Sequence, residues 1–211
     1  RAILSKHALY STFLAKASDE QRRYFVFSGV RHPLDKMVST YQKMVNNHNE
    51  RFTRKLNSDP RKAIFQIRDR LKFRKVQSGW SYGEFLKHTK VYDEVSSLDH
   101  DKFHFVMKFE TLESDFEKVL TQLDIPLIRK LPRFNSTEQK RDYMEFYNTD
   151  EIRRIAVKKM GPFIEKSSYS FPEHWGECKS SNWYQLKYRF WHILRIISWR
   201  YLRRGIRGHK L

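Results

Sequence analysis

The clearest hydrophobic pattern in the chain is a short apolar run followed at once by an amphipathic segment. Tyr24–Val30 is rich in aromatic and β-branched residues, which is typical of a buried strand. Pro33 follows, and proline is favoured in the first turn of a helix. Apolar residues then recur at helical spacing, at Leu34, Met37, Val38, Tyr41, Met44 and Val45. This order predicts half of a βαβ unit and therefore an α/β domain.

The same patterns predict further elements downstream. Residues 102–108 alternate like a second strand, and residues 115–123 have the spacing of the helix after it. Thr149 is a good N-cap for a helix through Met160, with acidic residues in its first turn. Residues 51–75 carry ten Lys or Arg and two Asp, which predicts a basic helix or two with a break at Pro60.

The tail differs from the rest of the chain. From Cys178 to Leu211 there are nine Lys or Arg and no acidic residue. We expect a domain over residues 1–176 and a basic, aromatic-rich helix over 177–211. Apolar residues fall at roughly helical spacing at Leu186, Phe190, Ile193, Ile197 and Tyr201, and Trp183, Trp191 and Trp199 lie among them. This stripe either covers a hydrophobic face of the sheet, the commoner use of such a stripe, or lies on an anionic membrane surface with Trp191 and Trp199 exposed together.

Composition narrows the classes of protein and of partner. The 211 residues carry a formal net charge of +18, and such a field attracts polyanions. One cysteine, Cys178, allows no intrachain disulfide and no cysteine-rich metal site. No run of about 18 apolar residues offers a membrane span, and no glycine-rich phosphate loop is present. The chain begins at Arg1 rather than Met, so we expect an N-terminal truncation, with any membrane anchor before it.

Candidate chemistry lies at the junction of the first strand and helix. Arg31 follows the strand, at the edge where open α/β sheets bind ligands. The helix N-terminus offers free N–H groups, and an arginine fork grips phosphate oxygens. Ser39, about two turns on, can donate to the same phosphate. From spacing alone, a surface ion pair for Arg31 and a solvent-facing Ser39 are favoured.

The full sequence of this segment favours the phosphate site over the surface ion pair. Phe25-Val-Phe-Ser-Gly-Val-Arg-His-Pro-Leu-Asp-Lys-Met-Val-Ser-Thr-Tyr41 resembles the 3′-phosphate-binding motif of sulfotransferases that use the donor 3′-phosphoadenosine 5′-phosphosulfate (PAPS). In the Golgi carbohydrate group this motif is approximately V-R-[DE]-P-x-x-R-L-[VI]-S-[AS]-[YF]. Here His32 replaces the acid, Lys36 the second arginine and Met37 the leucine. The resemblance implies that Arg31 and Ser39 hold the 3′-phosphate of PAPS.

Two further stretches are similar to the same family, in the same order. Residues 106–120 resemble its strand ending in K-[YF]-E-x-L and the next helix, with a structural role favoured for this stretch. Residues 143–172 are similar to its C-terminal helix and closing aromatic turn. The nearest subgroup is the Golgi chondroitin, dermatan and HNK-1 carbohydrate sulfotransferases. The implied fold is a mostly parallel central sheet flanked by helices, P-loop-like, with its first βα unit missing.

The family's loop for the 5′-phosphosulfate is not found between Arg1 and Tyr24. We therefore expect this fragment to bind donor poorly and to be inactive by itself. His7 begins a pattern, H-x-x-Y-x-x-F, that resembles uronyl 2-O-sulfotransferases, in which the histidine is the catalytic base. A structural role for His7 is an equal alternative. A family loop near Asn135 also contacts the nucleotide, which makes Ser136 a further candidate.

The sequence thus favours sulfuryl transfer from PAPS to a carbohydrate hydroxyl, without a metal. His100, His104 and His174 lack metal-ligand spacing. Residues 51–75 would suit an anionic glycan acceptor. A catalytically inactive scaffold remains an alternative, as does a module that binds polyanions or membranes. Nucleic acid is disfavoured because no nucleic-acid motif organises the basic residues. The resemblance implies the lumenal side of the Golgi membrane, and a bacterial cytoplasmic relative is the alternative.

Overall fold

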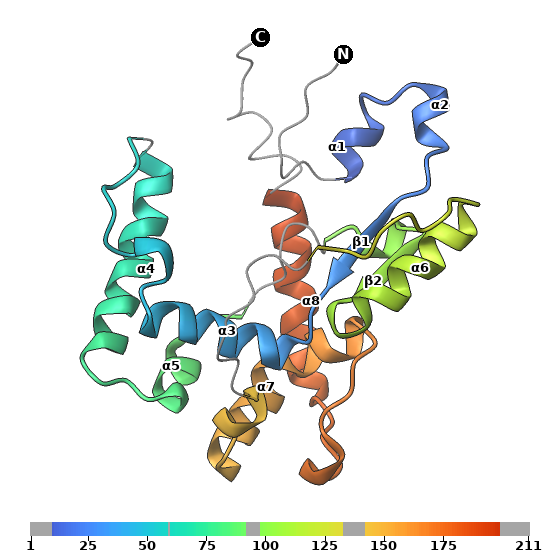
Figure 1. Cartoon of the computed structure of the whole chain (residues 1–211). Helices are drawn as coiled ribbons and strands as arrows, with labels where there is room; N and C mark the ends of the chain where they lie inside the picture. Colours follow the sequence, from blue (N-terminus) through green and yellow to red (C-terminus); the bar gives the residue numbers. More distant parts are fainter. Residues whose placement is uncertain (1–9, 59, 92–97, 133–141, 199–211) are drawn as a thin grey trace.

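The computed structural model describes residues 10–58, 60–91, 98–132 and 142–198 (Figure 1). Two strands and eight α-helices form this part of the chain: α1 (Tyr10–Leu14), α2 (Asp19–Arg22), β1 (Phe27–Val30), α3 (Pro33–Val45), α4 (Pro60–Gln77), α5 (Tyr82–His88), β2 (Phe105–Lys108), α6 (Leu112–Gln122), α7 (Asp150–Lys166) and α8 (Asn182–Ile197). Short 3-10 turns lie at His48–Glu50, His100–Lys102, Phe109–Thr111, Tyr143–Phe146 and Glu173–Trp175.

The two strands pair in parallel, with Phe27 opposite Phe105 and Val30 opposite Lys108. The sequence therefore predicted both strands and their α/β setting, although each is shorter than its hydrophobic run. In the described ranges the sheet consists of this pair, so the broader parallel sheet that the resemblance implied is not shown. Helix α6 packs beside β2, and α3 leads away from the end of β1 toward α4 and α5 (Figure 1).

The core lies where α3, α5 and α7 meet. Leu34 and Phe85 are fully buried, and Met160 contributes from α7. Two phenols are satisfied inside this core: the Tyr82 hydroxyl donates to the Tyr147 hydroxyl at 2.5 Å, and Tyr147 donates to the Leu34 carbonyl at 3.1 Å. Burial raises the pKa of both tyrosines well above the usual range. They therefore stay neutral, which a buried hydroxyl pair requires.

A lysine ties α7 to the end of α5. The Lys159 ammonium donates to the carbonyls of Leu86, Lys87 and Thr89 at 2.6, 2.5 and 2.9 Å. The last carbonyls of a helix have no partners within the helix. A cation placed at this end also complements the helix dipole. Lys159 thus closes the C-terminus of α5 and fixes its position against α7.

Helix α7 begins after Thr149, as the sequence predicted, but continues past Met160 to Lys166. Pro162 lies within it, and the helix persists because Met160 and Ile164 are buried in the core. A Cβ atom added at Gly161 would lie 2.8 Å from Cβ of Ser180. The absence of a side chain there lets the segment before α8 cross α7 closely.

Helix α8 packs on α7 through its aromatic and polar side. Tyr188 meets Phe163 edge-on with ring centroids 4.8 Å apart, and Gln185 donates to the Glu165 carboxylate. The apolar stripe lies on the other side: Phe190, Ile193 and Ile197 are 56%, 56% and 43% exposed. The favoured interpretation, that these three side chains cover the sheet, is therefore wrong. Residues 199–211, with Trp199 and Tyr201, lie outside the described ranges.

Candidate functional site at the end of β1

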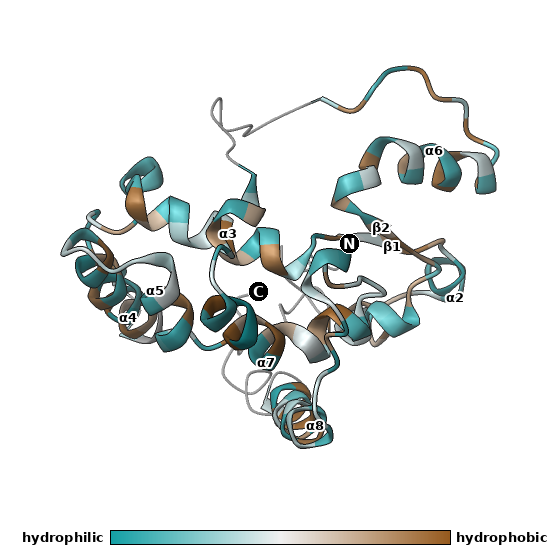
Figure 2. Ribbon diagram, turned by 90° about the horizontal axis from the view of Figure 1, so that it is seen from below, coloured by the Kyte–Doolittle hydropathy of each residue, from teal (hydrophilic) through white to brown (hydrophobic). Residues whose placement is uncertain are grey.

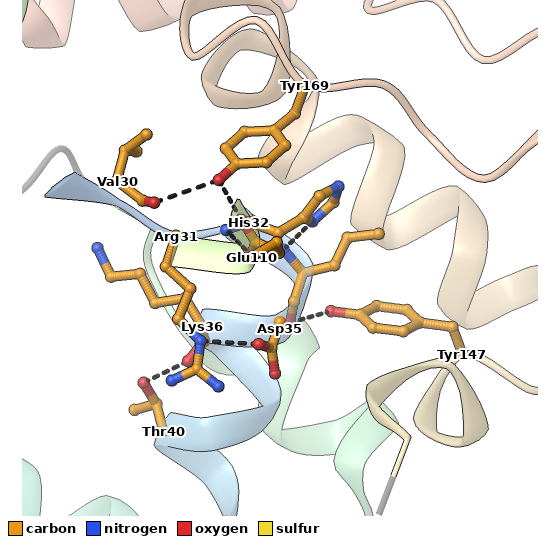
Figure 3. A network of polar contacts seen from close by, with 10 residues as sticks. Val30, Arg31, His32, Asp35, Lys36, Thr40, Glu110, Tyr147 and Tyr169 are labelled. Atoms are coloured by element: carbon orange, nitrogen blue, oxygen red, sulfur yellow. Dashed lines mark hydrogen bonds and ion pairs between the residues drawn. The ribbon is translucent and has the colours of Figure 1, made fainter. Parts of the chain in front are cut away.

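Arg31 lies directly after β1 and is held by an aspartate of α3. Its Nε donates to Oδ2 of Asp35 at 2.7 Å, and Asp35 is 4% exposed (Figure 3). The guanidinium also stacks on the Phe109 ring, 5.1 Å from its centroid. Its two terminal nitrogens donate no hydrogen bond to any residue that the structure describes. Asp35 and Phe109 therefore fix the plane of the guanidinium and leave its terminal fork available.

Ser39 lies one turn after Asp35 on α3 and is half-buried. Residues four apart on a helix share one face, so Ser39 lies on the face where Asp35 holds Arg31. Arg31 and Ser39 therefore lie toward one side of α3. Their binding role stays a prediction. The ion pair expected from spacing alone is also present, formed with a buried rather than a surface carboxylate.

His32 caps the N-terminus of α3. Its Nδ1 accepts from the Leu34 N–H at 3.2 Å, and its Nε2 lies 3.2 Å from the Ser170 carbonyl. An acceptor at Nδ1 and a donor at Nε2 correspond to one neutral tautomer. Burial lowers the pKa of His32, in spite of the opposing effects of Ser170 and Glu110. This histidine thus does what an acidic N-cap does, without bringing a negative charge.

Glu110 joins three separate parts of the chain behind His32. One carboxylate oxygen accepts from the His32 backbone N–H at 2.9 Å, and the other lies 2.5 Å from the Tyr169 hydroxyl. That hydroxyl is also 3.2 Å from the Val30 carbonyl (Figure 3). Burial, followed by the bond to Glu110, raises the pKa of Tyr169 above its ordinary range. The network locks the end of β1 to the turn after β2 and to the segment after α7.

A cavity of about 430 Å³ opens beside this network. His32, Lys108, Tyr143 and Met144 line one part, and residues 168–174 line the rest. The Lys108 ammonium donates to the Ser168 carbonyl at 2.8 Å and lies 4.8 Å from the centroid of the Tyr169 ring. Arg31 and Ser39 are not among the residues that line it. The strand ends therefore present two neighbouring features, the Arg31 fork and this cavity.

Two other sequence candidates, His7 and Ser136, lie outside the described residues. Sequence reasoning missed the partners that hold Arg31 and His32. Asp35 could have been found, because it follows Arg31 by four residues, the spacing of helical ion pairs. The resemblance pointed to the segments that contain Glu110 and Tyr169, but their contact could not have been found, because 59 residues separate them and no local pattern links them.

Among the described residues, no cluster of histidine, cysteine or acidic side chains is arranged to hold a metal ion. None of the helices described is both long and apolar enough to cross a membrane.

Comparison with known proteins identifies the family. Residues 4–169 match the model of the sulfotransferase family, which covers most of the chain, including β1, α3, β2 and Tyr169. No curated protein and no solved structure matches the chain. The strand-end arginine, the helix that starts at Pro33 and the match over residues 4–169 agree: the chain belongs to the sulfotransferase family, whose members transfer sulfuryl groups.

Proposed function

We propose that the protein takes a sulfuryl group from PAPS and that Arg31 and Ser39 hold the donor's 3′-phosphate. One observation supports this most: Arg31 is anchored through Nε alone, at the end of a parallel strand. Its terminal nitrogens can then meet two phosphate oxygens side by side. Because Asp35 already fixes the guanidinium plane, little side-chain freedom is lost on binding.

The surroundings of Arg31 suit a phosphate in two further ways. The positive end of the α3 dipole favours an anion near its first turn. His32 caps this turn as a neutral group, so its side chain does not repel a phosphate as an acidic cap would. Two carboxylates lie nearby and both are engaged: Asp35 by Arg31, and Glu110 by the His32 N–H and the Tyr169 hydroxyl.

The acceptor we propose is a carbohydrate hydroxyl, and an anionic glycan suits the charge of the chain. In α4, the basic residues include Arg68, Arg70, Lys72, Arg74 and Lys75, against one acid, Asp69. Such a helix attracts sulfated or carboxylated sugars through its field. We propose His7 as the base that removes the acceptor proton. Histidine suits this step near neutral pH, and His7 is within the family match.

The test is calorimetric titration of the full-length protein with adenosine 3′,5′-bisphosphate, the donor without its sulfuryl group. Arg31→Ala should weaken binding by about 1.5–3 kcal/mol, because a charged hydrogen bond is lost. Arg22→Ala removes an exposed arginine of α2 and serves as the matched control. Equal affinity in the two variants would refute the donor site.

Sulfuryl transfer is measured separately, with radiolabelled PAPS and a panel of glycans. His7→Ala should lower kcat by about 10²–10⁴ if His7 is the base. A protein that binds the nucleotide but transfers nothing to any hydroxyl would instead be an inactive scaffold. Near-normal turnover in the His7 variant would give this residue a structural role.

A further inference from the structure

The apolar face of α8 points away from the rest of the described fold. Three- and four-residue spacing puts six apolar residues on one side of the helix: Trp183, Leu186, Phe190, Ile193, Leu194 and Ile197. All six are exposed, Trp183 and Leu186 by 67% and 62%. Tyr184, Gln185 and Tyr188 occupy the opposite side, which faces α7. Figure 2 shows α8 at the edge of the molecule, next to α7. We call the six residues the α8 stripe.

The charges beside the stripe indicate what covers it. Lys187 and Arg189 are exposed and lie on its two edges. From Cys178 to Leu211 the chain carries nine basic residues and no acidic one. A second copy of the chain would bring two such segments together, and like charges would repel. A nucleic acid would satisfy the charges but would leave the apolar residues uncovered in water.

A surface that is both anionic and apolar meets both requirements. We propose that α8 lies in the plane of an anionic lipid bilayer, with the α8 stripe among the acyl chains and Lys187 and Arg189 at the headgroups. Trp183 and Phe190 suit this boundary because tryptophan and phenylalanine partition well at membrane interfaces. The helix does not cross the bilayer, in agreement with the lack of any spanning helix among those described. The attachment is independent of the proposed donor site.

The experiment is sedimentation of the whole chain with lipid vesicles. Vesicles of phosphatidylcholine containing about one third phosphatidylserine should bind the protein, and pure phosphatidylcholine should bind it at least about tenfold more weakly. Ile193→Glu should lower binding to the anionic vesicles by at least about tenfold, because a charge replaces an inserted side chain. The matched control is Ile64→Glu, the same change at an exposed isoleucine of α4, 65% exposed.

A second pair of variants separates charge from insertion. Lys187→Gln with Arg189→Gln should weaken binding to anionic vesicles and leave binding to neutral ones unchanged. The proposal is overturned if the two glutamate variants lose binding equally, since the net charge alone would then be responsible. It is also overturned if the chain binds no vesicles, or if Ile193→Glu splits a dimer. Finally, if Ile193→Glu lowered the unfolding temperature as much as a core substitution does, the chain itself would cover the stripe, and the proposal would be overturned.

Discussion

Helices α3 and α8 have similar patterns of apolar residues, but the apolar face is buried in α3 and exposed in α8. Each has apolar residues at three- and four-residue spacing. The N-cap residue is His32 in α3 and Ser181 in α8. Leu34 and Val38 of α3 are 0% and 4% exposed, because α5 and α7 pack against them. The stripe of α8 is exposed, and its N-cap residue Ser181 makes no side-chain hydrogen bond to the helix.

The difference shows what an amphipathic pattern does and does not specify. Periodicity tells which residues share a face, but the partner of that face depends on where the chain places other elements. For α3 the partner is a core with satisfied polar groups, such as Tyr147 and Lys159. For α8 the polar and aromatic side is the one that meets the protein, so the apolar side remains available to another surface.

The largest expected contrast comes from removing one aliphatic side chain from each helix. Leu34→Ala should lower the free energy of unfolding by about 2–5 kcal/mol, because it leaves a cavity at a fully buried position. Ile193→Ala should change it by about 0.5 kcal/mol or less, as surface substitutions do. Urea denaturation followed by circular dichroism measures both. Similar losses would mean that the α8 stripe is buried in solution, so that α3 and α8 would not differ in the burial of their apolar faces.

A smaller effect is expected from removing the Lys159 ammonium, which joins α7 to the end of α5. Lys159→Met should cost about 1.5–3 kcal/mol, because three carbonyls at the end of α5 lose a charged donor. Lys158→Met is the control, since this exposed neighbour mainly lies over the Tyr184 ring of α8 and its loss should cost about 0.5–1 kcal/mol. Denaturant midpoints compare the two. Equal costs would show that the α7–α8 contact is as firm as the α5–α7 contact.

The smallest effect concerns the start of α3 and depends on pH. Because burial lowers the pKa of His32 below 6.5, acid protonates this histidine more readily in the unfolded chain. Its contribution to stability is therefore present above about pH 6.5 and is lost as the pH falls, by at most about 1.4 kcal/mol per pH unit. His32→Asn keeps a capping acceptor but does not titrate. Between about pH 6.5 and 5, the unfolding free energy of this variant should fall less than that of the parent protein.

His48, which is exposed after α3, provides the control for this pH series. His48→Asn should keep the pH dependence of the parent protein, because it leaves the buried cap in place. If the two variants gave the same curve, the acid sensitivity would have to come from other groups, and His32 would not be the buried neutral cap that we describe.

Much of the fold follows from local patterns. The sequence predicted β1, α3 and β2 from short runs and α7 from its N-cap, because burial and capping are encoded within a few residues. It did not predict α5, whose seven residues are too few for a clear period. It also gave α7 too early an end, because the burial of Ile164 outweighs the presence of Pro162. In both cases tertiary packing decides.

The sequence predicted the candidate phosphate-binding residues of the site but not the contacts that hold them. The motif around Arg31 and Ser39 pointed to the end of β1, and the structure confirms this position for the arginine. The contact between Glu110 and Tyr169, which orients the site, joins distant segments, and no spacing rule reveals it. A single sequence shows which side chains can do chemistry, whereas their support depends on the fold.

The pairing of β1 with β2 has a consequence for how the protein is made. Phe27 and Phe105 are 78 residues apart, and Tyr169 closes the same network from still farther along the chain. Helices form from local contacts within microseconds, but a parallel pair must first close a long loop. During synthesis, α3 and α4 are translated before β2 and Tyr169. β1 therefore gains its parallel partner only after β2 has been translated, and the network at its end is complete only after Tyr169 has been added.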